Sequence, residues 1–311
     1  MPVETARSLS SEAMALATFF ARASVEITPK TLKGLLSAAQ PLPAGSAVFI
    51  AFMPDQDIEE MATVAAKVRA AGWLPIAHIP ARSMTSVAML NRYLDVLAAN
   101  DAIEELLLVG GGTDSARGPF DSVMAMLDSG AFEGRAIRRL HFAGHPEGHP
   151  NVSEQVMIAA LQAKLAWAEA RGIDGAIATQ FCLEGAPIFA WERKLRAAGI
   201  TAPVRVGLPG PATLKSLLMF AGLCGVGNSM RVLKRQALNI AKLTRVNIAD
   251  KLIVELANHG VQHEDSLLAA PHMYPFGGVA RTLALTGMLR DGGFHLDGKG
   301  GFSLARDLEA S

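Results

Sequence analysis

The chain alternates between short runs of apolar residues and longer segments in which apolar residues recur every three or four positions. The short runs are continuous rather than alternating, which is typical of strands covered on both faces of a sheet. Eight such runs predict eight strands, at residues 24–28, 47–52, 74–79, 105–110, 139–144, 175–181, 203–207 and 266–271.

The segments between these strands predict amphipathic helices, most clearly at residues 57–71, 83–100, 152–171 and 187–198. Gly72, Gly172 and Gly199 follow the ends of such segments, where glycine commonly terminates a helix. Strands that alternate with helices predict a parallel sheet. Eight of them favour a closed (β/α)₈ TIM barrel over an open doubly wound sheet, which usually has fewer strands and a glycine-rich first turn.

The predicted barrel fills most of the chain as one domain. We expect an N-terminal helix at residues 1–20, the catalytic barrel at 21–290 and a C-terminal tail at 291–311. The tail is rich in Gly and Asp, which predicts a loose extension. The interval between the seventh and eighth strands, residues 208–265, has room for two or three extra helices.

The composition limits the classes of protein to which the chain can belong. Among 311 residues, 29 Lys and Arg balance 29 Asp and Glu, so we expect neither nucleic acid nor an anionic membrane as a partner. Two cysteines, Cys182 and Cys224, form no disulfide framework and lack the spacing of metal ligands. The N-terminus lacks the pattern of a signal peptide, and no uninterrupted apolar run reaches membrane-spanning length. We expect a cytoplasmic protein, and the neutral charge is compatible with a homo-oligomer.

Catalytic groups of such barrels stand where the strands end, and three polar residues occupy these positions. Glu26 lies among apolar residues of the first strand; facing the interior, it would have a raised pKa and suit general-acid catalysis, whereas at a strand edge it would be solvated. His78 is a ligand contact or a buried core histidine. Gln180 offers a donor and an acceptor to the amide-like edge of a heterocycle, or satisfies backbone groups instead.

Three consecutive glycines follow the fourth strand, at Gly110, Gly111 and Gly112. A plain turn needs one glycine, whereas three let backbone amides approach a ligand closely, such as a phosphate or a flat ring. The run does not match the dinucleotide fingerprint, in which the glycines are spaced apart. We therefore predict a contact with a bound ligand.

The loop after the fifth strand, Gly144-His-Pro-Glu-Gly-His-Pro150, carries two histidines that each precede a proline. Proline favours an extended conformation for the residue before it, which argues against reading His145 and His149 as a helical metal motif. A stiff polar loop at a barrel mouth instead suggests ligand contacts, and we expect no metal. Farther along, Phe220 lies in an apolar helical run, where spacing alone predicts a core position.

Together these segments resemble the methylenetetrahydrofolate reductase family of FAD-containing (β/α)₈ barrels. The loop at residues 144–150 is similar to the family's Tyr-Pro-Glu-x-His-Pro loop, residues 179–181 to its Ile-Thr-Gln-Phe strand, and residues 207–210 to its Gly-Ile-Leu-Pro turn. The resemblance runs from about Glu26 to Ala221, with a looser match at the eighth strand.

The resemblance implies roles for five side chains. Glu26 falls on the family's catalytic glutamate, Gln180 on its folate-binding glutamine, and Phe220 on the phenylalanine that stacks against the aminobenzoyl ring of folate. His78 and His149 fall on histidines that the family uses around its flavin.

The residues at the flavin-contacting positions match the family less well than the residues at the folate-contacting positions do. Gly110, Gly111 and Gly112 stand in the segment where the family has Leu-Arg-Gly-Asp, so the aspartate beside the flavin is missing unless Asp114 replaces it. His145 replaces a tyrosine, and a basic pair for the FAD phosphates is not evident near residues 166–170. Each lost charge-assisted contact removes about 1.5–3 kcal/mol, so several together would weaken FAD binding by orders of magnitude.

The resemblance implies reduction of 5,10-methylenetetrahydrofolate to 5-methyltetrahydrofolate, with Glu26 as general acid. Hydride would come from FAD reduced by NAD(P)H, which the family favours, or directly from NAD(P)H. Two alternatives remain open: a flavin-free, folate-dependent methyltransferase on the same barrel, and a non-catalytic folate-binding protein.

Overall fold

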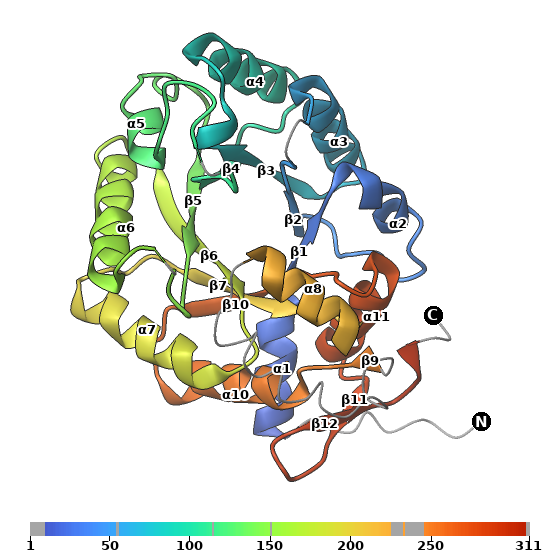
Figure 1. Cartoon of the computed structure of the whole chain (residues 1–311). Helices are drawn as coiled ribbons and strands as arrows, with labels where there is room; N and C mark the ends of the chain where they lie inside the picture. Colours follow the sequence, from blue (N-terminus) through green and yellow to red (C-terminus); the bar gives the residue numbers. More distant parts are fainter. Residues whose placement is uncertain are drawn as a thin grey trace.

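Eight parallel strands close into a barrel in the computed structural model, which confirms the predicted fold class (Figure 1). Each strand pairs with its neighbours along the chain, and β10 closes the barrel between β7 and β1. The strands are β1 (Ser24–Ile27), β2 (Ala47–Ile50), β3 (Leu74–Pro80), β4 (Glu105–Val109), β5 (Arg139–Gly144), β6 (Asp174–Phe181), β7 (Val204–Pro209) and β10 (Leu268–Tyr274).

Helices surround the barrel and lie across its ends (Figure 1). They are α1 (Ser11–Ala21), α2 (Leu32–Leu36), α3 (Ile58–Ala70), α4 (Val87–Ala99), α5 (Val123–Leu127), α6 (Glu154–Glu169), α7 (Gly185–Ala197), α8 (Leu214–Cys224), α10 (Asp250–Gln262) and α11 (Val279–Arg290), with 3₁₀ turns at Pro29–Thr31 and Ala81–Ser83. Side-chain oxygens accept from backbone N–H groups at the starts of five of these helices, which explains where they begin. These N-caps are Ser10, Asp57, Ser86, Ser122 and Ser153. Gly72, Gly172 and Gly199 have positive φ angles of 83°, 68° and 77°, as expected of helix-terminating glycines.

The structure describes residues 10–53, 56–113, 115–149, 151–224, 233 and 246–308. Asp114 and, in the interval between β7 and β10, residues 225–232 and 234–245 therefore lie outside the described residues. On either side of that gap, β8 (Ala212–Thr213) pairs with β9 (Val246–Asn247). None of the described helices combines the length and apolar character needed to cross a membrane.

Two predictions about the C-terminal part are wrong. The eighth strand continues beyond Pro271 to Tyr274, because β10 is paired on both sides and Pro271 is accommodated within it. The tail is not loose: β11 (Phe294–Leu296) and β12 (Phe302–Leu304) form an antiparallel hairpin. Its phenylalanines, Phe294 and Phe302, are buried against the core, and this apolar contact outweighs the Gly-rich composition.

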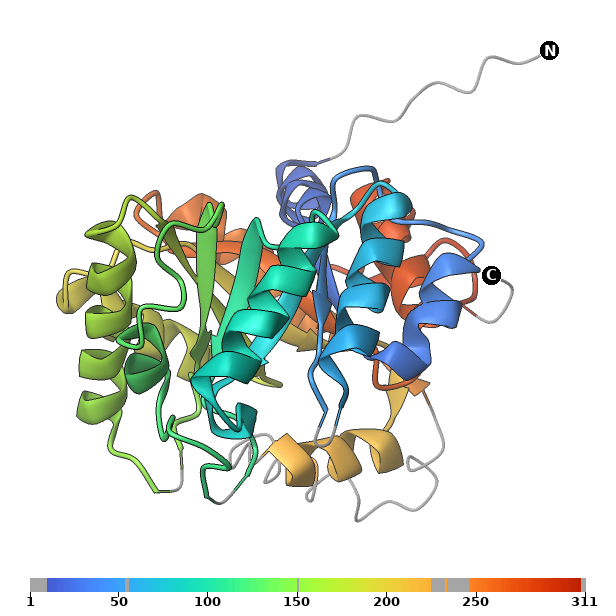
Figure 2. The ribbon, with the colours of Figure 1, turned by 90° about the horizontal axis from the view of Figure 1, so that it is seen from above.

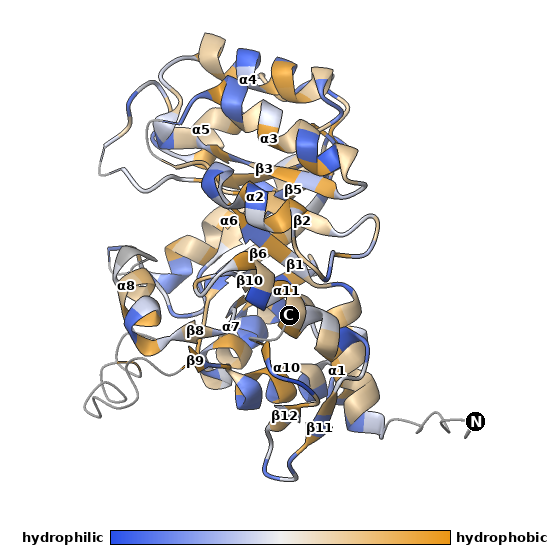
Figure 3. Ribbon diagram, turned by 90° about the vertical axis from the view of Figure 1, so that its right-hand side faces the viewer, coloured by the Kyte–Doolittle hydropathy of each residue, from blue (hydrophilic) through white to orange (hydrophobic). Residues whose placement is uncertain are grey.

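Apolar residues fill the sheet, while the helices mix apolar inner and polar outer positions (Figure 3). Inside the barrel, Phe49 is fully buried and its ring contacts the rings of His141 and His272, at centroid distances of 5.1 and 4.5 Å. Below it, where the strands begin, Glu105 pairs with His141 at 2.8 Å and with Arg139 at 3.2 Å. This ionic cluster and Phe49 close that end of the barrel, so an internal cavity can open only at the opposite end.

The two ends of the barrel are covered differently. Helix α8 lies across the end where the strands finish, and α1 lies at the other end (Figure 2). There α1 packs against α10 and α11 through an apolar face that includes Leu16 and Phe20, each 1% exposed. The end under α8 is the one at which barrel enzymes place their catalytic groups.

Candidate active site

A cavity of about 640 Å³ opens at the carboxyl ends of the strands. Its volume lies in the range typical of sites for small organic ligands. Most of the residues predicted from sequence line it together: Glu26, His78, Gly110, Gly111, Gly112, His145, His149 and Gln180. Phe220 is not among the lining residues, and Asp114 lies outside the described part of the chain.

Glu26 points into the barrel because strand residues alternate between the two faces of a sheet. Its neighbours Val25 and Ile27 are each 1% exposed and belong to the core between strands and helices. The Glu26 side chain keeps 20% exposure, on the cavity side. The solvated strand-edge alternative is therefore excluded for this residue.

Two histidines flank the Glu26 carboxylate. Oε2 of Glu26 lies 3.5 Å from Nε2 of His78 and 3.6 Å from Nε2 of His272. Both Nε2 atoms are buried and have no hydrogen-bond partner among the residues that the structure describes. His272 is held on its other side, where Nδ1 is hydrogen-bonded to Oγ of Ser24 at 3.0 Å. Two imidazole edges therefore face one carboxylate, at distances that a small shift of the side chains would convert into hydrogen bonds.

The electrostatics of Glu26 differ from the expectation. Burial raises the pKa of its carboxyl. The contact with His272 and the charges of His78 and His272 lower this pKa by more, so it lies below its ordinary value. Sequence reasoning considered burial alone, because the histidine partners were not evident. Burial also lowers the pKa of His78 to about 4, against an opposing influence from Glu26. Glu26 is thus ionised at neutral pH while His78 is neutral, so any proton that Glu26 transfers must first reach it from elsewhere.

Gln180 is presented by a β-bulge. The pairing of β6 with β7 shifts register between Ala178 and Phe181, which leaves Gln180 outside the regular ladder. The side chain of Thr179 bridges the gap: its Oγ1 donates to the Gln180 carbonyl at 2.7 Å and accepts from the Gly207 N–H at 2.8 Å. A Cβ on Gly207 would lie 2.5 Å from the Gln180 carbonyl oxygen, so only glycine fits opposite the bulge.

Phe220 belongs to an aromatic cluster beside the cavity. Its ring stacks on Phe276 at 4.2 Å and 17°, and Phe276 in turn lies parallel to Tyr274 at 5.5 Å and 19°. Tyr274 lines the cavity, so this column of rings leads from the cavity wall to α8. The prediction that Phe220 stacks on a ligand ring stays a prediction, and its present partner is Phe276.

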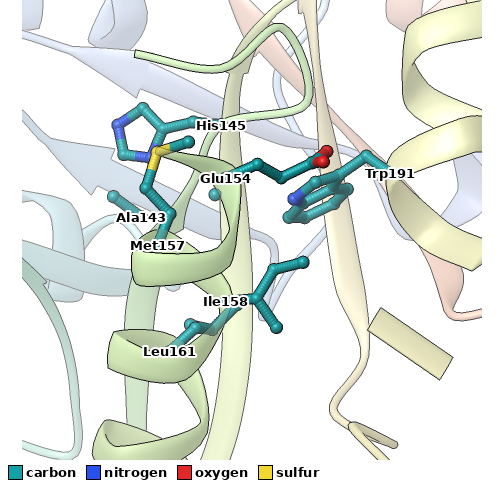
Figure 4. Close-up of a pocket in the computed structure, with 8 residues that line it drawn as sticks. Ala143, His145, Glu154, Met157, Ile158, Leu161 and Trp191 are labelled. Carbon is teal, nitrogen blue, oxygen red and sulfur yellow. The ribbon is translucent and has the colours of Figure 1, made fainter. Parts of the chain in front are cut away.

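The wall formed by the glycine run and the histidine loop is the part that the resemblance assigns to flavin. His145 lines the main cavity and also a cavity of about 20 Å³ between α6 and α7, large enough for one water (Figure 4). Burial lowers the pKa of His145 to about 4, with contributions from the charges of His149 and Lys164, so its imidazole is neutral. The described residues contain no group of three or more His, Cys, Asp or Glu side chains able to hold a metal ion.

Sequence reasoning missed His272 and Tyr274. Both follow Pro271, where the predicted strand ended, and both point into the barrel because they are two positions apart on β10. The available signal was the segment Pro271-His-Met-Tyr274 itself, in which polar and apolar residues alternate as in a strand with one face toward a cavity.

The fold is a (β/α)₈ barrel with a cavity at the carboxyl ends of its strands. No protein-family model matches the chain. Among solved structures, it is similar to an uncharacterized protein from Clostridium thermocellum that binds two copies of 5-methyl-5,6,7,8-tetrahydrofolic acid, with 11% sequence identity, a TM-score of 0.59, and coverage of 86% of this chain and 95% of that chain. A GH18 chitinase from Pseudoalteromonas aurantia matches at 8% identity and a TM-score of 0.48, covering 86% and 99% of the two chains. The likeness to the Clostridium thermocellum protein shows a shared fold.

Proposed function

We propose that the cavity binds a reduced folate and that the protein reduces 5,10-methylenetetrahydrofolate to 5-methyltetrahydrofolate. The observation that carries the proposal is the meeting of Glu26 and Gln180 in one cavity, with two histidines at the carboxylate. The family resemblance, which rests on sequence motifs alone, assigns Glu26 to catalysis and Gln180 to folate binding. The similar barrel from Clostridium thermocellum, which binds 5-methyltetrahydrofolic acid, gives independent support.

The reaction requires a proton and then a hydride. A proton delivered to N10 breaks the bond between N10 and the bridging carbon, which leaves a methylene iminium cation at N5. Hydride addition to this carbon gives the 5-methyl product. The ionised Glu26 carboxylate would stabilise the iminium cation, since a fixed charge in a partly dry pocket acts strongly on a neighbouring charge.

The proton would reach Glu26 from water in the cavity, to which its side chain is exposed, rather than come from a permanently protonated glutamic acid. His272 lies 3.6 Å from the carboxylate, and the hydrogen bond to Ser24 fixes the orientation of its ring. His272 would hold the carboxylate in place, and Glu26 would pass the proton to N10, directly or through a water. Gln180 would meanwhile hold the polar edge of the pterin and fix its distance from Glu26.

The described residues do not fit a tightly held FAD. Arg82 lines the cavity beside the glycine run, but its Nε and NH1 donate to the backbone carbonyls of Asp121 and Thr113, at 3.1 and 3.4 Å. Besides backbone amides such as those of the glycine run, a resident dinucleotide needs cations for its diphosphate, whereas a co-substrate is held only transiently. We therefore propose that NAD(P)H supplies the hydride directly.

The test combines the absorption spectrum of the purified protein with an NAD(P)H oxidation assay. The proposal expects a colourless protein that oxidises NADH or NADPH only when 5,10-methylenetetrahydrofolate is present and forms 5-methyltetrahydrofolate. A yellow protein that needs FAD for the same reaction would restore the flavin route. A protein that binds 5-methyltetrahydrofolate but oxidises neither nucleotide contradicts the reductase and favours the methyltransferase or the binding protein.

A further inference from the structure

We infer that Tyr274 is a positioning residue, whose hydroxyl fixes the β-bulge that presents Gln180 to the pterin. The inference rests on the proposed function, because it concerns how the folate site is held in shape. Tyr274 lies at the end of β10, on the opposite side of β7 from Gln180, yet its side chain lines the same cavity.

The hydroxyl of Tyr274 contacts the bulge where the ladder between β6 and β7 is interrupted. It donates to the backbone carbonyl of Thr179 at 2.9 Å, across the intervening strand β7. The side chain of Thr179 bridges the interrupted ladder, since it is hydrogen-bonded to both Gln180 and Gly207. Holding Thr179 in place therefore holds the backbone from which the Gln180 amide extends. A β-bulge changes the direction in which a side chain points, so this contact helps to set the direction of Gln180.

The ring of Tyr274 contacts the rest of the site. It meets the ring of His272 edge-on at 4.8 Å and 78°, and lies parallel to Phe276 at 5.5 Å. Phenylalanine would keep these ring contacts and fill the same volume. The substitution Tyr274→Phe thus isolates the hydroxyl, leaving the Glu26–His272 pair and the aromatic column in place.

The test is a double-mutant cycle on the dissociation constant of 5-methyltetrahydrofolate, measured by calorimetry. Tyr274→Phe should weaken binding by about 3- to 10-fold, the usual effect of losing one hydrogen bond. In the Gln180→Ala background the same substitution should have almost no effect, because a residue that acts through Gln180 has nothing left to position. The turnover number should change less than KM.

Thr286→Val is the matched control. The Thr286 hydroxyl also donates to a backbone carbonyl, that of Thr282 at 2.8 Å, but within α11 and outside the cavity wall. Its loss should leave the dissociation constant unchanged. Equal effects of Tyr274→Phe in both backgrounds, or equal effects of Tyr274→Phe and Thr286→Val, overturn the inference alone. Wild-type protein that fails to bind 5-methyltetrahydrofolate overturns the proposed function, and the inference falls with it.

Discussion

Replacing Glu26 with glutamine should separate catalysis from folding and ligand binding. The amide keeps the size of the side chain but carries no charge and relays no proton. General acid–base catalysis contributes about 10²- to 10⁴-fold to rate, so the turnover number should fall by at least this factor. That loss corresponds to about 3–5 kcal/mol of transition-state stabilisation. Folate binding should persist, since Gln180 holds the pterin edge in this account.

The structure also predicts the effect of Glu26→Gln on stability. The pKa of Glu26 is lowered overall, because its interactions with His272 and His78 outweigh the effect of burial, so the ionised carboxylate contributes to stability at pH 7. The free energy of unfolding, measured by urea denaturation at pH 7, should therefore decrease modestly while the protein still folds. Turnover would be followed as NAD(P)H oxidation with 5,10-methylenetetrahydrofolate, and binding by titration with 5-methyltetrahydrofolate.

Glu192→Gln is the matched control, because Glu192 is a second buried carboxylate with a histidine partner. It accepts hydrogen bonds from His259 Nε2 at 2.8 Å, Ser266 Oγ at 2.8 Å and the Leu267 N–H at 2.6 Å. Its substitution should cost about 1–3 kcal/mol of stability, since buried donors lose their acceptor. Turnover of the folded protein should be unchanged. Near-normal turnover in Glu26→Gln, or equal loss of turnover in both variants, would refute the assignment of Glu26.

Three further predictions concern neighbouring parts of the site. His272→Gln should lower the turnover number more than it weakens folate binding, because it removes a side chain that holds the Glu26 carboxylate in place; an unchanged turnover number would contradict this role. Gly207→Ala should weaken folate binding, since its Cβ would lie 2.5 Å from the Gln180 carbonyl oxygen and displace the bulge; calorimetry that shows wild-type affinity would argue against this geometry. His78 has a folded pKa of about 4, below its unfolded value of 6.5, so its contribution to stability is present above pH 6.5 and lost as the pH falls toward 4. Urea denaturation should show a loss of about 2 kcal/mol from this residue between pH 7 and pH 5, and His78→Gln should reduce the loss; an equal loss in the variant would contradict the assignment.

The barrel was predictable because its strands and helices leave different periods in the sequence. Continuous apolar runs and helix-terminating glycines such as Gly72 mark the elements without any tertiary information. The two departures have local causes. Pro271 looked like the end of a strand, and the Gly-rich tail concealed two phenylalanines that bury as a hairpin.

The candidate site was predictable only in part. Glu26 and Gln180 lie at strand ends and carry the resemblance, so both could be identified as site residues from the sequence. The pKa of Glu26 depends on His272, which lies far away along the chain and comes beside it only when β10 closes the barrel. The stacking of Phe220 on Phe276 likewise depends on how β10 and α8 meet. Interactions of this kind come from tertiary packing and leave no local pattern.

The crystal structure of the complex with 5-methyltetrahydrofolate tests the central claim most directly. We expect the pterin inside the cavity at the strand ends, with its polar edge within about 3.5 Å of the Gln180 amide and N5 facing the Glu26 carboxylate. A pterin bound elsewhere on the barrel, or inside the cavity with Gln180 and Glu26 both out of reach, would contradict it.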